Sequence, residues 1–185
     1  MAEHVCPWWL GYFLASPVRK LFQNPIRIVS PYITEGMTVM DVGSAMGFFS
    51  IPMGRLVGLS GKVICVDLQE RMIASLRKRI EKAGLTDRME TRTCSQHSLN
   101  IEDLGQSIDF ALTFALVHEV PDKKGLFTQI LHTLKRNGRL LVAEPSGHVS
   151  QKEFGATIGL AKAAGFSVGE DLNIAKSHAC LLIKG

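Results

Sequence analysis

The sequence predicts a three-layer, doubly wound α/β domain built on a mostly parallel sheet of seven strands. From residue 36 onward, short apolar runs alternate with longer segments of helical periodicity, which is the pattern of repeated strand–helix–strand units. Because such units close with right-handed crossovers, their strands lie parallel and the helices cover the sheet. Near the C-terminus, two strand patterns follow each other without a helix between them, which predicts a terminal antiparallel hairpin.

The first half of this region predicts three strands and two helices. Strands are expected at 38–42, 62–67 and 89–94. Helices are expected over 48–59 and over 69–83, and Gly84 ends the second. The residues expected on the inner faces recur at helical spacing: Phe49, Met53, Leu56 and Val57 in the first helix, and Met72, Ile73, Leu76, Ile80 and Ala83 in the second.

The second half predicts four strands and two helices. Strands are expected at 109–114, 139–144, 166–168 and 178–184. Asp122 is predicted to cap a helix that ends at the Asn-Gly pair 137–138, and Ser150 to cap a helix that ends before Gly165. The inner faces are expected to carry Leu126, Phe127, Ile130, Leu131 and Leu134 in the first helix, and Phe154, Ile158, Ala161 and Ala164 in the second.

The composition is that of an ordinary globular protein, with 46% hydrophobic and 21% charged residues among 185. It excludes a disordered, collagen-like or disulfide-scaffold protein. At about 100–200 residues per domain, we expect an N-terminal extension over 1–35 and one α/β domain over 36–185. The 21 basic and 17 acidic residues leave a net charge of +4. Lysine and arginine occur in small scattered groups, so we expect no nucleic-acid substrate.

The four cysteines, at positions 6, 65, 94 and 180, are far apart in the sequence. No C-x-x-C pair or Cys/His ligand spacing is present, so we expect no metal site. Cys65 and Cys180 lie in apolar runs, where a free thiol behaves as a small hydrophobic group. This usage indicates a reducing compartment, and we expect the protein in the cytoplasm.

Residues 5–18 are apolar and aromatic but too short for a membrane span. The segment holds 14 residues interrupted by two prolines, whereas a spanning helix needs about 20. We expect it to be a latch at the sheet edge or a lid over a pocket, where Trp8, Trp9, Tyr12 and Phe13 would stack on a ligand. The alternative is a weak contact with a membrane surface, with the basic pair at 19–20 behind the segment.

The candidate ligand site lies after the first strand, at the sequence Asp-Val-Gly-Ser-Ala-Met-Gly of positions 41–47. In doubly wound folds the ligand binds beyond the carboxyl ends of the strands. Small residues in this turn let a ligand approach the backbone closely. The second strand ends in Asp67, 24 positions after Gly43, where a carboxylate can accept both hydroxyl hydrogens of a ribose.

A dinucleotide site is one interpretation of this turn, but the pattern G-x-A-x-G lacks the third glycine of G-x-G-x-x-G. Asp41 also precedes the first glycine by two residues. A carboxylate at that place suits a cationic ligand better than a pyrophosphate.

The run VMDVGSAMGFF, followed by KVICVDLQ, resembles the first two motifs of class I S-adenosylmethionine (SAM) dependent methyltransferases. Asp41, Gly43 and Gly47 match the pattern D-x-G-x-G-x-G, with Ala45 in place of the middle glycine. IDFALTFALVHEV, LKRNGRLLVAEP and HACLLIKG resemble the later strands of the family. The resemblance runs from Gly36 to the C-terminus, about four fifths of the chain. It is nearest to small-molecule members of the quinone-biosynthesis kind, and it implies a Rossmann-like methyltransferase fold.

The resemblance also implies a cofactor site for SAM, or for S-adenosylhomocysteine (SAH) as the product. The methionine and ribose end would lie against the turn, and Asp67 would bind the ribose hydroxyls. The residues implied around it are Asp41, Gly43, Ser44, Ala45 and Gly47 in the turn, Leu68 beside the adenine, Ser95 and Gln96 at the adenine edge, and Phe114 near the methionine part.

Methyl transfer needs a general base only when the nucleophile carries a proton of high pKa. His118, our first choice for a base, and Glu119 follow the fourth strand; Glu144 ends the fifth, and His148 comes soon after. Each has a structural alternative, since a histidine can cap or pack and a carboxylate can bind backbone amides at a loop start.

The sequence as a whole predicts a SAM-dependent methyltransferase acting on an unidentified small molecule. Two alternatives stay open. One is a non-catalytic SAM-binding or regulatory protein on the same fold, because a fold does not fix a function. The other is a nicotinamide-dependent oxidoreductase.

Overall fold

The computed structural model describes residues 23–185. The aromatic segment with Trp8, Trp9, Tyr12 and Phe13 lies outside the described residues, so its predicted role stays a prediction. The chain divides into two compact units, of which the first ends at Cys94 and the second begins at Ser95. This division differs from the predicted one, which separates an N-terminal extension (1–35) from a domain (36–185). The predicted division also stays a prediction.

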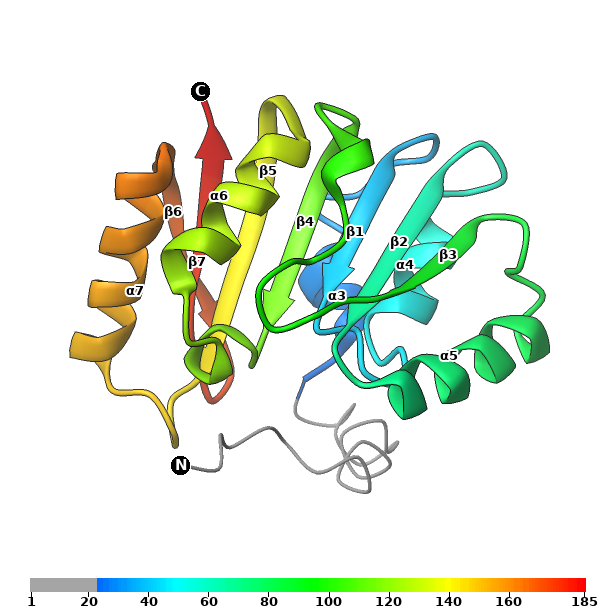
Figure 1. Cartoon of the computed structure of the whole chain (residues 1–185), viewed down its shortest axis with the longest axis horizontal. Helices are drawn as coiled ribbons and strands as arrows, with labels where there is room; N and C mark the ends of the chain where they lie inside the picture. Colours follow the sequence, from blue (N-terminus) through cyan, green and yellow to red (C-terminus); the bar gives the residue numbers. More distant parts are fainter. Residues whose placement is uncertain (1–22) are drawn as a thin grey trace. The chain divides into compact units, whose positions relative to one another are not determined.

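The described part of the first unit holds three parallel strands and three helices (Figure 1). In chain order these are α3 (Pro25–Val29), β1 (Thr38–Val42), α4 (Ser50–Leu56), β2 (Lys62–Asp67), α5 (Glu70–Lys82) and β3 (Met89–Thr93). β2 lies between β1 and β3 and pairs in parallel with both. Because both crossovers step in the same direction, right-handedness places α4 and α5 on the same face of these strands.

Burial in the first unit follows the sequence pattern. Five consecutive residues of β2 are buried, which is typical of a parallel strand inside an α/β sheet. The buried residues of α5 recur at helical spacing, and the rest of that helix is exposed or half-buried: Met72, Ile73, Leu76 and Ile80 form the inner face. Gly84, with φ of 67°, follows α5 in the left-handed conformation that ends many helices.

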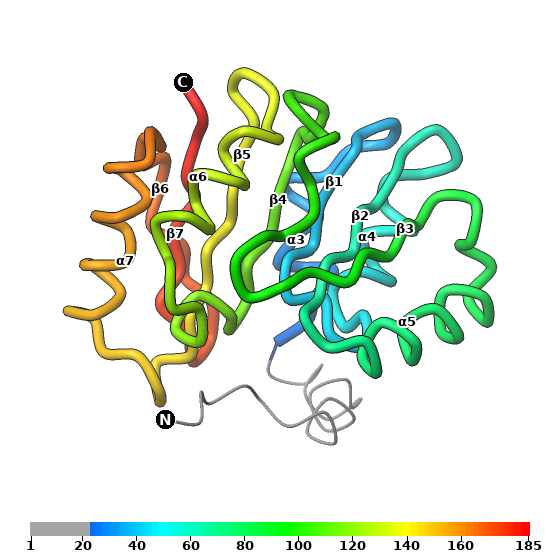
Figure 2. Tube along the Cα trace, viewed as in Figure 1, coloured from blue at the N-terminus to red at the C-terminus, as the bar shows by residue number. Residues whose placement is uncertain are grey.

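The second unit continues the alternation and closes with a hairpin, as the Cα trace shows (Figure 2). Its elements are η1 (Glu102–Leu104), β4 (Ile108–Phe114), η2 (Val117–Glu119), α6 (Lys123–Thr133), β5 (Leu134–Pro145), α7 (Gln151–Ala164), β6 (Phe166–Ile174) and β7 (Ser177–Lys184). β4 and β5 are parallel, whereas β7 is antiparallel to both β5 and β6.

Both predicted helix caps of the second unit are confirmed. The Asp122 carboxylate accepts a hydrogen bond of 2.8 Å from the amide of Gly125 and so begins α6. Ser150 and Glu153 form a reciprocal capping box at the start of α7. Each cap binds backbone amides that have no hydrogen-bond partner inside the helix, which is why these residues determine where the helices begin.

The strand order of the seven-stranded sheet is β3-β2-β1-β4-β5-β7-β6. This order and the antiparallel C-terminal hairpin confirm the predicted fold class, including the number of strands. Within residues 23–185, no helix has the length and apolar character needed to cross a bilayer.

Four predicted boundaries were wrong. The helix expected to reach 137–138 ends at Thr133, because Leu134 pairs with Ile108 and already belongs to β5. For the same reason, the strand expected at 139–144 begins five residues earlier, at Leu134. The helix expected over 48–59 is confined to Ser50–Leu56, and Gly58, two residues after its end, has a left-handed backbone conformation. The strand expected at 166–168 extends to Ile174, because β7 pairs with it again beyond a register shift between Val168 and Glu170.

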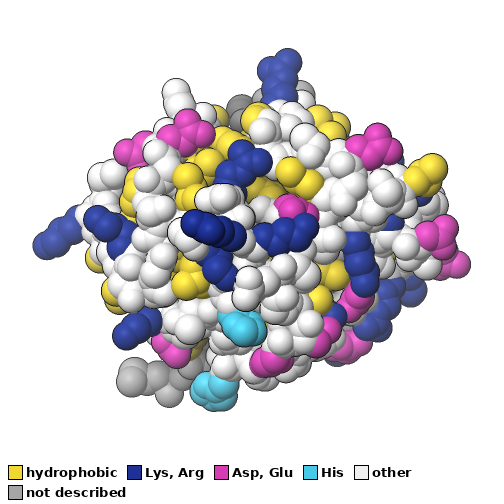
Figure 3. Space-filling model, turned by 90° about the horizontal axis from the view of Figure 1, so that it is seen from above, with side chains coloured by type: hydrophobic (Ala, Val, Ile, Leu, Met, Phe, Trp, Pro, Cys, Tyr) yellow, Lys and Arg dark blue, Asp and Glu magenta, His cyan; other side chains and the backbone are white. Residues whose placement is uncertain are grey.

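The surface charges agree with the scattered pattern in the sequence. On the face drawn in Figure 3, lysine and arginine side chains occur both near the middle and at the margins, with acidic side chains among them. Several basic residues are paired with acids, such as Lys62 with Glu90 at 2.6 Å and Lys135 with Asp109 at 2.7 Å.

Candidate functional site

The turn after β1 contains three left-handed residues within five positions. Gly43, Ala45 and Gly47 have φ of 79°, 46° and 85°. The amides of Gly43 and Ser44 both donate to the carbonyl of Val66 in β2, at 2.8 and 3.0 Å. Glycine adopts this backbone freely, whereas alanine does so at a cost of about 1–2 kcal/mol. The surrounding contacts therefore hold the turn in a left-handed conformation that Ala45 adopts only at a cost.

Gly47 lies where the turn meets both α4 and α5. A Cβ added to it would lie 2.5 Å from Leu76 Cδ1 and 3.2 Å from Ile51 Cγ1. Its amide donates to the carbonyl of Ser44 at 2.9 Å. The position is thus restricted to glycine by the space around it as well as by its backbone.

Asp67 ends β2 and is 8% exposed. Its Oδ2 accepts the amide of Ala45 at 2.8 Å and its Oδ1 accepts the amide of Gln69 at 2.9 Å. Burial raises the pKa of this carboxyl, and the two amide hydrogen bonds oppose the rise. A carboxylate offers about four lone-pair positions, so each oxygen can accept one further hydrogen bond. The pair of remaining positions suits two adjacent hydroxyl groups.

Two further polar groups near this turn are buried. Asp41 is 3% exposed, and its Oδ2 accepts a hydrogen bond of 2.5 Å from the hydroxyl of Ser50. Asp41 pairs in register with Cys65 on β2, and burial together with this charge raises the pKa of the thiol. The hydroxyl of Ser44 is buried without a hydrogen-bond partner among the described residues. Such an orphan group costs about 1–3 kcal/mol, which is a reason to expect a ligand's polar atom beside it.

Arg79 of α5 also contributes to the turn, and the sequence analysis missed it. Its guanidinium donates a hydrogen bond of 2.7 Å to the carbonyl of Met46. Arg79 follows Leu76 by three positions and is half-buried, so it lies on the inner side of an amphipathic helix. A charged residue at an inner helix position was the signal that could have revealed it.

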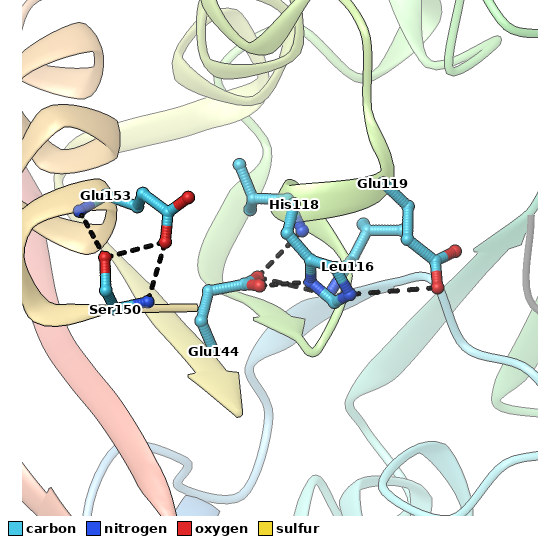
Figure 4. Close-up of polar contacts among 7 residues, drawn as sticks. Leu116, His118, Glu119, Glu144, Ser150 and Glu153 are labelled. Atoms are coloured by element: carbon cyan, nitrogen blue, oxygen red, sulfur yellow. Dashed lines mark hydrogen bonds and ion pairs between the residues drawn. The ribbon is translucent and has the colours of Figure 1, made fainter. Parts of the chain in front are cut away.

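A second cluster forms in the second unit around Glu144, which is the next-to-last residue of β5 and is 1% exposed. Figure 4 shows this carboxylate pointing at the loop that follows β4. Its Oε1 accepts the amides of Leu116 and Val117 at 3.2 and 2.8 Å. Its Oε2 is hydrogen-bonded to Nδ1 of His118. One buried carboxylate therefore fixes three consecutive residues of this loop.

His118 is half-buried and has a charged neighbourhood. The hydrogen bond to Glu144 raises the pKa of the imidazole, burial opposes the rise, and the charges of Glu144 and Glu119 add to it. Nε2 lies 3.9 Å from Oε1 of Glu119 (Figure 4), which is too far for a hydrogen bond. The ring of His148 lies 6.3 Å from that of His118, centre to centre. The predicted pair His118 and Glu119 is therefore brought together, with Glu144 behind the imidazole.

A family model described as a methyltransferase domain matches residues 33–176 of the chain. The chain belongs to this methyltransferase domain family. With the fold described above, membership places it among the class I SAM-dependent methyltransferases, as the motifs predicted.

Three known proteins show how this methyltransferase domain compares. The ubiquinone/menaquinone biosynthesis C-methyltransferase UbiE of Escherichia coli is 30% identical over 113 residues, which are 60% of this chain and 44% of UbiE. The chain therefore spans less than half the length of the curated relatives it matches.

A SAM-dependent methyltransferase from Aquifex aeolicus has a TM-score of 0.87 at 22% identity, covering 98% of this chain and 100% of that chain. A protein described as a putative methyltransferase from Methanococcus maripaludis has a TM-score of 0.76 at 18% identity, covering 100% and 97%. At these identities the two structures bear on the fold alone.

The class implies SAM as the cofactor, and the first unit of this methyltransferase domain fits it chemically. Asp67 keeps two acceptor positions, which matches the two hydroxyls of a ribose. The unpartnered hydroxyl of Ser44 can bond a polar atom of the ligand. Four predicted site residues lie in the turn: Gly43, Ser44, Ala45 and Gly47. Asp41 precedes the turn, and Asp67 is hydrogen-bonded to it through the amide of Ala45.

The remaining predicted residues stay predictions. Leu68 follows Asp67 and is half-buried, and Phe114 ends β4 half-buried. The hydroxyl of Ser95 accepts the amides of His97 and Ser98, at 3.3 and 3.0 Å, so it is engaged in its own loop. Gln96 beside it is exposed. Among the described residues, no three His, Cys, Asp or Glu side chains are grouped to hold a metal ion.

Proposed function

We propose that the protein transfers the methyl group of SAM to a small-molecule acceptor. The single observation that carries this proposal is the buried Asp67 carboxylate, whose two oxygens hold the turn and Gln69 while each keeps one acceptor position. Membership of the methyltransferase domain family supports it. When bound, SAM supplies a methyl group on a sulfonium, which is already a good leaving group.

Different residues of the chain would bind different parts of SAM. Asp67 would accept the ribose hydroxyls, the turn residues Gly43 to Gly47 would lie against the methionine end, and Ser44 would bond a polar atom there. Leu68, Ser95 and Gln96 are proposed beside the adenine, and Phe114 near the methionine part. The assignments of Asp67 and Ser44 are supported by their burial in the first unit. Those of Leu68, Ser95, Gln96 and Phe114 rest on the family resemblance alone.

The acceptor is proposed to be small, and the relative UbiE supports this by its name as a C-methyltransferase of ubiquinone and menaquinone biosynthesis. His118 is proposed as the general base and Glu119 as its neighbour in that step. A reducing compartment such as the cytoplasm is supported by the free thiols of Cys65, Cys94 and Cys180. We propose no nucleic-acid substrate, given the interspersed surface charges.

Titration calorimetry with SAH tests the proposal. We expect binding to the full chain, and we expect Asp67→Ala to weaken it at least about tenfold, because a hydrogen bond to a charged acceptor contributes about 1.5–3 kcal/mol and 1.4 kcal/mol is tenfold. Asp87→Ala, which removes an exposed carboxylate of the same unit, should leave the affinity unchanged. A thermal melt of each variant separates lost binding from lost folding.

The same titration distinguishes the alternatives. If SAH at high micromolar concentration gives no heat of binding, the proposal is refuted. If the protein binds NADH in preference to SAH, it is an oxidoreductase. Tight SAH binding with no turnover across a broad set of acceptors would indicate a regulatory SAM-binding protein.

A further inference from the structure

We infer that Glu144 is the positioning residue that prepares His118 to take a proton, so that the acceptor is an uncharged compound whose nucleophilic atom bears a hydrogen, such as a phenolic or enolic hydroxyl. This inference rests on the proposed function and adds to it the chemical class of the acceptor. It stands on the geometry of the second unit alone.

The carboxylate of Glu144 is fixed more firmly than a surface acid. It is 1% exposed and receives hydrogen bonds from the backbone of Leu116 and Val117 and from the ring of His118. A buried carboxylate without such donors would be strongly disfavoured. The three donors come from three consecutive residues, so the loop after β4 and the buried acid hold each other in place.

The hydrogen bond to Glu144 also decides which nitrogen of His118 is available. An ionised carboxylate accepts and cannot donate, so the neutral ring must carry its hydrogen on Nδ1 and keep the lone pair on Nε2. Carboxylates behind metal-bound or catalytic histidines fix the tautomer in this way. In the described part of the chain, no side chain or amide hydrogen-bonds Nε2, and the nearest acidic oxygen, on Glu119, is 3.9 Å away. Nε2 is thus a base with a fixed direction.

Both interacting elements lie at the carboxyl edge of parallel strands. Glu144 is the next-to-last residue of β5, and His118 follows β4, which is the parallel neighbour of β5. Ligands of doubly wound folds bind beyond this edge. A base held there by a buried acid would have no use for a thiolate or a tertiary amine, since neither has a proton to lose before attack.

For methylation of oxygen, the acceptor's O–H bond breaks and its proton goes to Nε2 of His118. A bond forms between that oxygen and the methyl carbon, and the carbon–sulfur bond of SAM breaks with its electron pair kept by sulfur. For methylation of a conjugated carbon, the hydroxyl proton again goes to Nε2, and that carbon forms the bond to the methyl carbon as the carbon–sulfur bond breaks. The carbon then loses its own proton, and the oxygen regains one. In both cases one proton is released overall, through His118 to solvent.

The pH dependence follows from the groups around the ring. Glu144 from β5 and Glu119 from η2 favour the imidazolium, while Lys123 from α6 opposes it. Since the pKa of His118 is raised from 6.5, the neutral base predominates only above that raised value, and the rate should rise with pH through it. The stability that Glu144 gives to the imidazolium is fully present below pH 6.5 and is lost as pH rises through the raised pKa.

Glu144→Gln tests the inference sharply, because glutamine keeps one oxygen for the amides of Leu116 and Val117. Its NH2 group replaces Oε2 and must donate, so Nδ1 becomes the acceptor and the neutral ring moves its hydrogen to Nε2. The loop is kept while the base is lost. Glu170→Gln, which removes an exposed acid of β6, is the matched control.

Nitrogen-15 NMR of the full chain gives a readout independent of turnover. We expect His118 of the wild type to show the Nδ1–H tautomer and a raised pKa, and Glu144→Gln to show the Nε2–H tautomer and a lower pKa. The other histidines serve as internal references. An unchanged tautomer and pKa in Glu144→Gln would overturn the positioning role.

Activity with a series of substituted phenols completes the test. We expect kcat/KM to fall about 10²–10⁴-fold in Glu144→Gln, the range that a general base contributes, with SAH affinity unchanged within about twofold and Glu170→Gln equal to the wild type. Transfer to thioethers or tertiary amines but to no phenol would overturn the acceptor class. Absence of SAH binding in the wild type would instead count against the proposed function.

Discussion

Replacing Gly47 with alanine is expected to lower the free energy of unfolding by about 2–5 kcal/mol, from two separate costs. The backbone there has φ of 85°, and a left-handed conformation costs an L residue about 1–2 kcal/mol. The new Cβ would lie 2.5 Å from Leu76 Cδ1 and 3.2 Å from Ile51 Cγ1. Leu76 is fully buried, so its side chain must shift within a filled core, and overpacking of this kind costs about 1–3 kcal/mol.

Gly84→Ala separates the two costs. Gly84 is also left-handed, with φ of 67°, but nothing lies within 4 Å of an added Cβ. Its replacement should therefore show only the backbone cost of about 1–2 kcal/mol. The difference between the two variants, about 1–3 kcal/mol, then measures how tightly the turn is held between α4 and α5.

Urea unfolding followed by circular dichroism gives both values in the same buffer, provided that the slopes agree. SAH calorimetry on the folded variants should show weaker binding for Gly47→Ala and unchanged binding for Gly84→Ala. If Gly47→Ala is no less stable than Gly84→Ala, Leu76 moves aside freely, and the argument that the two helices shape the turn is refuted.

Two further predictions concern groups that support the same turn. Arg79→Met removes the hydrogen bond to the Met46 carbonyl and should weaken SAH binding by about 3–10-fold, since a hydrogen bond contributes about 1 kcal/mol. Lys78→Met, on the exposed side of α5, should leave the affinity unchanged. If calorimetry shows equal losses of affinity for both variants, the loss comes from the changed net charge and not from this hydrogen bond. Ser50→Ala removes the hydroxyl that donates to the buried Asp41 and should lower the free energy of unfolding by about 1.5–3 kcal/mol. Ser60→Ala, at an exposed position, should change it little. If both variants unfold at the same urea concentration, the Ser50–Asp41 hydrogen bond does not stabilise the fold.

Local chemistry explains why much of the fold could be predicted from the sequence. β1 and β2 were predicted with their observed bounds, because each buried run ends at a glycine or at Asp67. The caps at Asp122 and Ser150 were predictable because each acts on amides within its own first helical turn. The hairpin followed from the lack of a helix pattern before β7. None of these features depends on contacts with distant residues.

The boundaries that failed depend on distant partners. The helix spacing of α6 continues smoothly to Leu134, so the sequence favours a longer helix. In the structure, Lys184 of β7 donates to the carbonyls of Leu131 and Leu134, at 2.8 and 2.7 Å, and Ile108 pairs with Leu134. These partners lie 50 or more residues downstream and 26 upstream, outside any local pattern. β6 was underestimated for the same reason, since β7 supplies its hydrogen bonds.

The candidate site shows the same division between local and distant contacts. Motif spacing indicated Asp67 and the turn, but it could not indicate Arg79, because the atom that Arg79 binds is the carbonyl of Met46 and every residue has a carbonyl. For Glu144 the sequence left a structural and a functional interpretation open. The carboxylate binds the amides of Leu116 and Val117, as the structural one requires, and it also holds His118 through Nδ1. One side chain therefore meets both descriptions. Glu144→Gln, which keeps the acceptor for the amides and reverses the hydrogen bond to the imidazole, separates holding the loop from preparing the base.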